Sequence, residues 1–414
     1  MRLAFFHPKF TGVGGAENLI AAQAGYLRRQ GHELRIVGHF DARARWQTTF
    51  PDAELQELDA LPWQQFYVPK VTQLERRLPE VVRAFTGCDA VIAHNFPNSA
   101  LLGRAAVSGV TRLWYCNEPN RKLHLEAANP NLAAHLATHP ARSHVERFFV
   151  RRQRFQRATE LLSGRAQLRA YDKQFTAQIE VLCANSEFTR DNLRRIYRRD
   201  DAHVVYPIVR FPERGRARQG IDRSRGLQVL THSRLDTVKN IDHVLEGFAL
   251  YRSRPEGRSA QLHVVGSGGQ AKRLRALAKQ LQLGDAIRFH GFLPLDELER
   301  VYDACDVFAL TPLDEPFGMV FPEAAARGLL LIGSDHGGPN EILDGGALGW
   351  TCDPFSPAAL ADVLARVAAT SDAELDDRRT RADAACRSRY GEATVGPLLA
   401  RLAGASSSEP VARV

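Results

Sequence analysis

The sequence is poor in cysteine and has no long apolar run. Six cysteines lie scattered among 414 residues, and none forms a C-x-x-C pair. This spacing excludes a disulfide framework, does not fit a zinc ribbon, and favours a reducing compartment. No apolar run reaches the roughly 18 residues that a membrane span needs. Met1-Arg2 leads directly into the short run Leu3–Phe6, which is too brief for a secretory signal. We therefore expect a cytoplasmic protein.

Positive charge is unevenly distributed along the chain. Lysine and arginine number 55 against 47 acidic residues, which gives a net charge of +8. Residues 1–205 hold 29 basic and 20 acidic residues, and the rest of the chain holds 26 and 27, so the halves carry +9 and −1. Eight arginines lie among aromatic and aliphatic residues within one stretch: Arg142, Arg147, Arg151, Arg152, Arg154, Arg157, Arg165 and Arg169. This stretch fits either a solvated amphipathic helix or a surface for an anionic partner, such as a membrane on which the protein would be peripheral. Nucleic acid is disfavoured because stacking aromatics and a known binding motif are absent.

Short apolar runs alternate with helical stretches, a pattern typical of parallel βαβ units. Strands are predicted at 3–7, 34–37, 90–94, 113–116, 181–184, 227–231, 261–265, 287–290, 307–310 and 329–332. Helices are predicted at 16–30, 79–86, 99–107 and the arginine-rich stretch, and others begin near residues 241, 270, 295 and 318. We predict an α/β fold with two Rossmann-like doubly wound domains, 1–205 and 206–390. A C-terminal helix in 391–414 would return toward the first domain and end in a frayed tail. A ligand would lie in the cleft between the carboxyl ends of the two sheets.

Three turns that follow predicted strands carry residues suited to binding phosphate. The first strand leads into Gly12–Glu17, whose glycines allow close approach to an anion at a helix N-terminus. This spacing is not the dinucleotide fingerprint. In the second half, Arg234 and Lys239 stand five positions apart after a strand and could clamp a diphosphate, although two surface cations would give the same spacing. A third glycine-rich turn, 266–269, follows the next strand.

The segment from Asp314 to Gly328 is the most informative in the chain. Glu315 and Glu323 form an E-x7-E pair, with the first expected in a loop and the second inside the following helix. Gly318 near the helix start would leave backbone N–H groups available to an anion, and carboxylates accept hydrogen bonds from hydroxyls. Carboxylates, cations and an anion site together favour a nucleotide-sugar as ligand.

In this order, the motifs resemble those of a retaining glycosyltransferase of family 4. The resemblance runs through 14–17, 184–189, 204–207, Arg234…Lys239-Asn240, 265–268, the E-x7-E block and 337–341, and so covers nearly the whole chain. It implies the glycosyltransferase B fold and a mannosyltransferase-like group 1 enzyme. Such an enzyme would move a hexose from a nucleoside-diphosphate sugar to a glycan or polyprenyl-diphosphate-linked acceptor in polysaccharide biosynthesis.

The resemblance also implies roles for residues of the second half. Arg234 and Lys239 would neutralise the donor diphosphate, aided by the backbone N–H groups of Gly318, Met319 and Val320. Glu315 would act as a catalytic residue that holds the donor sugar. Glu323 would bind the ribose hydroxyls.

In the first half, the resemblance implies that Gly14 and Gly15 approach the diphosphate. His94 would be a catalytic residue near the donor sugar and the acceptor, whereas a lone histidine at a strand end is otherwise more often structural. Glu118, in Asn117-Glu118-Pro119, would lie on the acceptor side. Asn117 stands where several relatives have histidine, which puts the acceptor contacts at that point in doubt.

No D-x-D triplet occurs in the sequence. Metal-dependent glycosyltransferases use such carboxylates to hold a divalent ion on the diphosphate, so we expect no metal and no cofactor beyond the donor. GDP-mannose is the first choice of donor and UDP-glucose the second. The alternatives are a different enzyme on the same scaffold and a catalytically silent nucleotide-sugar-binding scaffold protein. The presence of both glutamates and both cations disfavours the silent scaffold.

Overall fold

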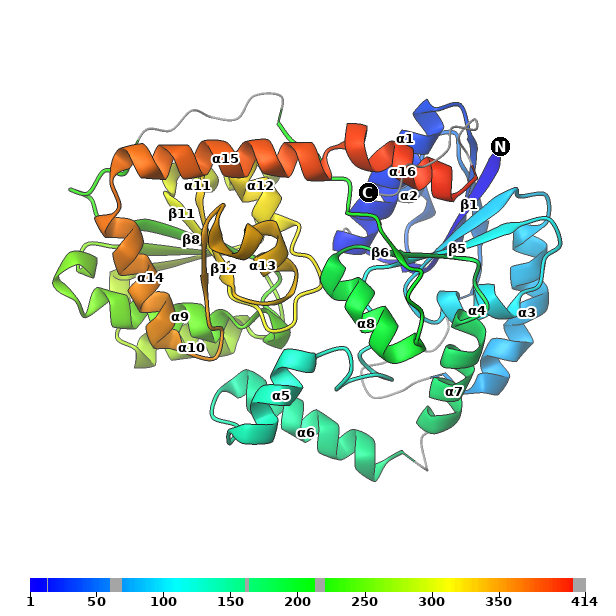
Figure 1. The fold of residues 1–414 in the computed structure, drawn as a ribbon, viewed down its shortest axis with the longest axis horizontal. Coiled ribbons are helices and arrows are strands. Elements are labelled where there is room, and N and C mark those ends of the chain that lie inside the picture. Colours follow the sequence, from blue (N-terminus) through cyan, green and yellow to red (C-terminus); the bar gives the residue numbers. More distant parts are fainter. Residues whose placement is uncertain (13, 60–68, 161–163, 213–219, 405–414) are drawn as a thin grey trace. The chain divides into compact units, whose positions relative to one another are not determined.

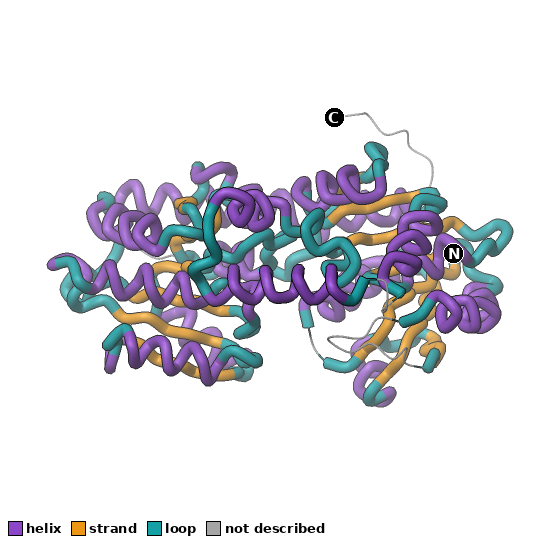
Figure 2. The backbone as a smooth tube through the Cα atoms, turned by 90° about the horizontal axis from the view of Figure 1, so that it is seen from below, coloured by secondary structure: helices purple, strands orange, loops and turns teal. Residues whose placement is uncertain are grey.

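The computed structural model describes residues 1–12, 14–59, 69–160, 164–212 and 220–404. The chain divides into two compact units. Unit 1 contains Met1–Ala128, Gln153–Val209 and Tyr390–Val414, and unit 2 contains Asn129–Arg152 and Arg210–Arg389. Each unit has its own parallel sheet with helices on both faces (Figures 1 and 2). These are two Rossmann-like domains of an α/β fold.

Seven parallel strands form the sheet of unit 1, in the order β3-β2-β1-β4-β5-β6-β7. Its strands are β1 (Arg2–Phe10), β2 (Glu33–Phe40), β3 (Glu54–Glu57), β4 (Ala90–His94), β5 (Thr111–Cys116), β6 (Val181–Ala184) and β7 (His203–Val204). Its helices are α1 (Gly15–Arg29), α2 (Arg43–Thr49), α3 (Val71–Phe85), α4 (Asn98–Arg104), α7 (Arg165–Thr176), α8 (Glu187–Tyr197) and α16 (Glu392–Leu402).

Alternate residues of β1 supply the two cores of unit 1. Leu3 and Phe5 face one side and pack in a core with α1 and α16, while Ala4 and Phe6 face the other side and pack in a core with α3, α4 and α7. Successive side chains of a strand point to opposite faces, and a parallel sheet is covered on both, so β1 is apolar throughout its centre.

Unit 2 has six parallel strands in the order β10-β9-β8-β11-β12-β13. Its strands are β8 (Gln228–His232), β9 (Gln261–Val265), β10 (Ile287–Gly291), β11 (Val307–Ala309), β12 (Leu330–Ser334) and β13 (Trp350–Cys352). Its helices are α5 (Pro130–Thr138), α9 (Ile241–Arg252), α10 (Ala271–Gln280), α11 (Leu295–Ala304), α12 (Val320–Ala326), α13 (Gly337–Ile342), α14 (Pro357–Ala369) and α15 (Asp372–Tyr390). The boundary between the units falls inside α6 (His144–Ala158).

The predicted domain ranges place one segment in the wrong unit. Residues 129–152, which the ranges assign to the first domain, pack with unit 2. No helix is predicted at the position of α5. The remaining changes of unit fall after Val209 and after Arg389, and α16 packs against α1, with Gly396 of α16 beside the Tyr26 ring. The predicted frayed tail lies mostly in 405–414, outside the described residues.

Two helix predictions are also wrong. The helix predicted at 79–86 begins at Val71, so Pro79 lies inside α3 rather than at its start. The arginine-rich stretch is not one helix but α6 and α7, with Gly164 in the left-handed conformation immediately before α7. The strands β3, β7 and β13 are not predicted; they are short and lie at the edges of the two sheets, where the sequence has no continuous apolar run.

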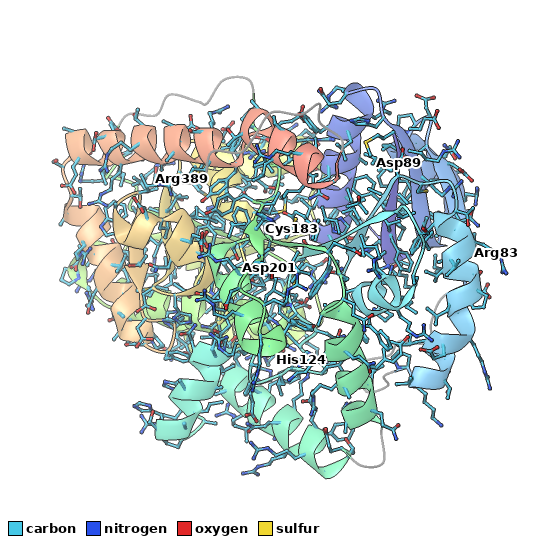
Figure 3. The ribbon with its side chains drawn as sticks, turned by 45° about the vertical axis from the view of Figure 1, so that its right-hand side comes forward. Arg83, Asp89, His124, Cys183, Asp201 and Arg389 are labelled. Carbon is cyan, nitrogen blue, oxygen red and sulfur yellow. The ribbon has the colours of Figure 1, made fainter. Side chains whose placement is uncertain are left out.

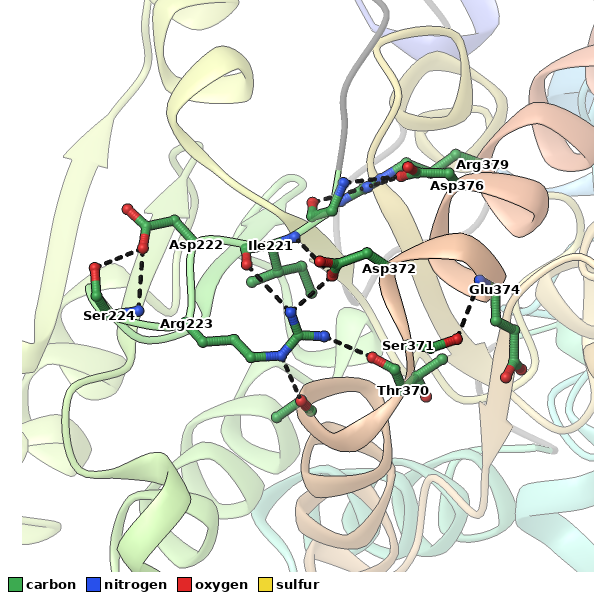
Figure 4. A network of polar contacts seen from close by, with 12 residues as sticks. Ile221, Asp222, Arg223, Ser224, Thr370, Ser371, Asp372, Glu374, Asp376 and Arg379 are labelled. Atoms are coloured by element: carbon green, nitrogen blue, oxygen red, sulfur yellow. Dashed lines mark hydrogen bonds and ion pairs between the residues drawn. The ribbon is translucent and has the colours of Figure 1, made fainter.

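Residues 220–224 of unit 2 are bound to the start of α15 by several hydrogen bonds. Arg223 pairs with Asp372 at 2.7 Å and donates a hydrogen bond to the Thr370 carbonyl at 2.6 Å (Figure 4). Gly220 N donates to Asp376 at 3.0 Å, and Arg379 donates to the Gly220 carbonyl at 2.9 Å. These bonds fix 220–224 against the start of α15.

All six cysteines are buried, and none takes part in a disulfide bond. Within the residues that the structure describes, no helix combines the length and apolar character needed to cross a bilayer.

Candidate active site

The predicted donor-binding residues of unit 2 all follow the carboxyl ends of its strands. Arg234 and Lys239 lie in the loop from β8 to α9, while Glu315 lies in the loop from β11 to α12. Because the strands are parallel, these loops share one edge of the sheet, where open α/β sheets bind ligands.

The loop after β8 and the loop after β9 are held together by backbone hydrogen bonds. Leu235 N donates to Ser267 O at 2.9 Å, and Gln270 N donates to Leu235 O at 2.9 Å. Gly266 has a φ of +124°, and a Cβ placed there would lie 1.8 Å from the Ser233 carbonyl oxygen. Only glycine therefore allows this approach. The turn predicted at 266–269 thus supports the loop that carries both cations.

Lys239 and Glu315 are brought into direct contact. The Lys239 Nζ lies 2.7 Å from the Glu315 Oε2, and the two side chains are 20% and 15% exposed. Sequence spacing cannot reveal this pair, because 76 residues separate its members. A cation and a carboxylate at one point can bind phosphate and hydroxyl groups of the same ligand.

Arg234 is much more open to solvent than Lys239. Its side chain is 76% exposed and pairs with Asp236 at 3.0 Å. Its guanidinium could exchange this exposed carboxylate for a phosphate at small cost, because exposed ion pairs contribute little.

Several hydrogen bonds fix the main chain of the turn that carries Glu315. Asn240 Nδ2 donates to the Thr311 carbonyl at 3.0 Å, and Ser334 Oγ donates to the Pro312 carbonyl at 2.6 Å. Gly338 N donates to the Glu315 carbonyl at 2.8 Å. The turn is therefore supported by the neighbouring loops after β8 and β12.

Glu323 lies inside α12 and Glu315 in the preceding loop, as predicted. Burial raises the pKa of Glu323 to about 7, although Arg327 acts in the opposite direction. The carboxylate of Glu323 therefore titrates in the neutral range.

The three residues whose backbone N–H groups are predicted to bind the donor lie at the start of α12. Met319 is the N-cap of α12, Val320 is its first residue, and Gly318 has a φ of +100°.

His94 ends β4 of unit 1 and is fully buried. Its ring stacks between Tyr115 and Phe5, with centroids 5.2 and 6.2 Å away. Burial, with a smaller effect of His7, holds the pKa of His94 well below its usual value. Neither ring nitrogen has a hydrogen-bond partner among the described residues. The ring is thus neutral and unpartnered.

His7 of β1, for which the sequence pattern predicts no role, lies beside the predicted glycine turn. Its Nε2 is 3.8 Å from the Glu17 carboxylate in the first turn of α1. Burial alone would raise the pKa of Glu17, but the nearby His7 and backbone N–H groups lower it overall. Gly14 is the N-cap of α1 and Gly15 its first residue. A Cβ on Gly14 would lie 2.7 Å from the Glu17 Oε2.

A cavity of about 240 Å³ opens at the carboxyl edge of the unit 1 sheet. Apolar residues such as Leu58, Val81 and Leu101 line it, together with the polar residues His7 and Asn98. In the part of the chain that the structure describes, the buried His7 Nδ1 and Asn98 Nδ2 lack hydrogen-bond partners. Buried polar atoms without partners are costly, and a hydroxyl-bearing ligand could satisfy these.

Glu118 follows β5 and pairs with Arg121 at 2.8 Å. The loop that carries it is pinned by a buried network. The His124 Nε2 lies 2.7 Å from the Asp172 carboxylate, which also accepts a hydrogen bond from Tyr197 at 2.7 Å. His124 is labelled in Figure 3. The predicted acceptor-side residue is thus exposed on a well-anchored loop.

The arginine-rich stretch is only partly available to an external partner. Arg165 is buried, Arg169 pairs with Glu160 at 2.8 Å, and Arg157 pairs with Glu126 at 2.9 Å. Exposed arginines remain at 147, 151 and 154 of α6, a spacing that places them along one side of the helix. Phe155, next to them, is 41% exposed.

Two family models together match most of the chain. Residues 13–210 match the model described as Glycosyltransferase Family 4, and residues 216–385 match the model described as Glycosyl transferases group 1. The chain belongs to the group 1 and family 4 glycosyltransferases.

Curated relatives are similar over part of the chain. Mannosylfructose-phosphate synthase of Agrobacterium fabrum is 32% identical over 188 residues, which are 43% of this chain and 40% of the relative. D-inositol 3-phosphate glycosyltransferase of Corynebacterium jeikeium is 32% identical over 144 residues, 34% of each protein. The chain thus spans less than half the length of these relatives.

Solved structures share the fold over nearly the full length. HepE of Anabaena in complex with UDP-glucose aligns with a TM-score of 0.68 at 17% identity, covering 98% of this chain and all of that one. Sucrose-phosphate synthase of Thermosynechococcus elongatus aligns with a TM-score of 0.68, covering 97% and 98%. The two Rossmann-like units are those of the glycosyltransferase B fold.

Proposed function

We propose that the protein is a retaining, metal-independent glycosyltransferase that moves a hexose from a nucleoside-diphosphate sugar to a glycan or lipid-linked acceptor. The observation that carries this proposal is the Lys239–Glu315 pair at the carboxyl edge of unit 2. Lys239 would turn to the diphosphate and Glu315 to the sugar hydroxyls once a donor enters. The unpartnered atoms of the unit 1 cavity support binding of a second, hydroxyl-bearing substrate.

The proposed reaction needs no protein nucleophile. The acceptor hydroxyl attacks the anomeric carbon from the side of the leaving group, and the bond from that carbon to the diphosphate oxygen breaks. The acceptor proton passes to a β-phosphate oxygen of the leaving group. Because attack and departure take place on the same face of the sugar, the configuration is retained. Arg234, Lys239 and backbone N–H groups near Gly318 would stabilise the departing nucleoside diphosphate, the part that a metal ion has in other enzymes.

Mannose from GDP-mannose remains our first choice of donor. A synthase whose name contains mannosylfructose-phosphate is among the similar proteins. UDP-glucose is the second choice, because HepE, which shares the fold, binds UDP-glucose. Only a few stacking and hydroxyl contacts with the protein would distinguish these two donors.

A donor panel tests the proposed function. UDP-glucose, UDP-N-acetylglucosamine and GDP-mannose would each be tested in thermal unfolding with UDP and GDP as references. A ligand at a hundred times its Kd should stabilise the fold by about 2.7 kcal/mol. We expect one donor to bind and to be hydrolysed slowly without acceptor. Binding without hydrolysis or transfer to any acceptor would favour the silent scaffold, and binding of none would contradict the proposal.

We further propose that α6 attaches the protein peripherally to an anionic membrane on its cytoplasmic face. Each cation near such a surface contributes about 1 kcal/mol, and exposed arginines at 147, 151 and 154 with Phe155 would act together. We expect pelleting with phosphatidylserine vesicles at low salt and release at high salt. The triple variant R147E/R151E/R154E should stay in solution, while R300E on α11 should pellet as before. Equal, negligible pelleting with anionic and neutral vesicles would leave the solvated-helix interpretation.

A further inference from the structure

Asp314, immediately before Glu315, caps a helix from the other half of the sequence. Its carboxylate is fully buried. The Oδ1 accepts hydrogen bonds from Asn131 N at 3.1 Å and Asn131 Nδ2 at 2.7 Å, and the Oδ2 accepts one from Leu132 N at 2.9 Å. Asn131 and Leu132 lie in the first turn of α5, whose free N–H groups and positive dipole end favour a carboxylate.

A second contact holds α5 on the same edge of unit 2. The His135 ring stacks face to face on Phe355, with centroids 3.9 Å apart. Phe355 follows Pro354, whose carbonyl accepts a hydrogen bond from Asn240 at 2.9 Å. Asn240 also bonds the Thr311 carbonyl of the Glu315 turn. Helix α5 is therefore built into the loops around Glu315, although its sequence lies between strands of unit 1.

We propose that Asp314 is a positioning residue for Glu315, and that α5 is a structural part of the donor site of unit 2. The proposal rests on the proposed function, since Glu315 is taken to bind the donor sugar. Asp314 has a φ of +49°, a left-handed conformation that is uncommon for non-glycine residues, although Asp adopts it more readily than most. Its bonds to α5 hold this conformation one peptide bond away from Glu315. Without them, the turn relaxes and Glu315 leaves the sugar.

A graded series of variants tests this proposal. N131A removes one of the three bonds, D314N keeps the shape but replaces one acceptor with a donor, and D314A removes all three. For the donor that the wild type uses, kcat should fall in this order, by at least tenfold in D314A. The Kd of free UDP or GDP should change less than threefold, because Glu315 is not its partner.

Asp306 provides a matched control at the opposite end of β11. It is also buried, and it accepts hydrogen bonds from Gln228 N at 3.0 Å and Arg225 at 2.8 Å. D306N should lower the unfolding temperature without lowering kcat. If D306N and D314N lose kcat equally, Asp314 has only a general structural role and the proposal fails.

A double-mutant cycle separates positioning from stability. If Asp314 acts through Glu315, D314N should have little further effect on kcat in an E315Q background. Additive losses would overturn the proposal. Hydrogen exchange gives a readout without activity: D314N should accelerate exchange at least tenfold in peptides covering 130–134 and 313–319. If the wild type uses no nucleotide-sugar, the proposed function fails, whereas unchanged exchange in D314N shows that α5 does not hold the turn.

Discussion

Replacing Lys239 by alanine is expected to reduce kcat/KM for the donor by up to about a hundredfold. A charge-assisted hydrogen bond contributes roughly 1.5–3 kcal/mol, and every 1.4 kcal/mol corresponds to about a factor of ten. K239A removes such a bond to the diphosphate, from a side chain that is only 20% exposed and is therefore weakly screened by solvent.

The second cation should matter less. R234A is expected to lower kcat/KM about tenfold, because Arg234 is 76% exposed and already pairs with Asp236. Arg300, 77% exposed and paired with Asp296 in the same unit, is the matched control, and R300A should change nothing. Steady-state kinetics with and without excess EDTA would measure these effects. Full activity in EDTA is expected, and a strict need for magnesium or manganese would contradict metal independence.

Substitution of each glutamate of the E-x7-E pair should impair a different property of the enzyme. E315Q is expected to lower turnover at least tenfold while free UDP or GDP still binds, because its proposed partner is the sugar. E323Q should weaken binding of the free nucleoside diphosphate, because its proposed partner is the ribose. Calorimetric titration of both variants tests this division. Equal losses of nucleotide affinity would show that the roles are wrongly assigned.

The raised pKa of Glu323 adds a pH dependence to this prediction. With a pKa of about 7, the carboxylate is mostly protonated at pH 6 and mostly ionised at pH 8. Since the ionised form accepts hydroxyl hydrogen bonds better, nucleotide affinity relative to E323Q should rise with pH, by up to roughly tenfold across this range.

The free energy of unfolding should change with pH in the opposite direction to the nucleotide affinity. The folded state keeps a proton that the unfolded chain releases near its ordinary pKa of 4.5. The contribution of Glu323 to the free energy of unfolding is therefore fully present below that pH and is lost as the pH rises through about 7. E323Q should remove this dependence, which denaturant unfolding at pH 4.5 and pH 8 would measure. A wild type and a variant with parallel pH profiles would show that the pKa of Glu323 is not raised in the folded protein.

The sequence alone determined the class of fold and the loops that carry the candidate site. Central strands of a parallel sheet are covered on both faces and form apolar runs, so β4, β6 and β9 are found at their predicted ends. The E-x7-E pair is also found as predicted, with one glutamate in a loop and one in a helix. These features are local, because strand pattern and helix start depend on residues a few positions apart.

Tertiary structure decided the contacts between distant segments. Lys239 meets Glu315 across 76 residues, and Asp314 caps α5 across more than 180. Each partner alone has an ordinary pattern: α5 begins with Asn129-Pro130, and Asp314 stands among other loop residues. A buried carboxylate needs donors from somewhere, but a sequence does not say which helix supplies them. The packing of 129–152 within unit 2 determines which helix supplies the donors. It brings the first N–H groups of α5, which have no partner inside the helix, to a carboxylate that water cannot reach.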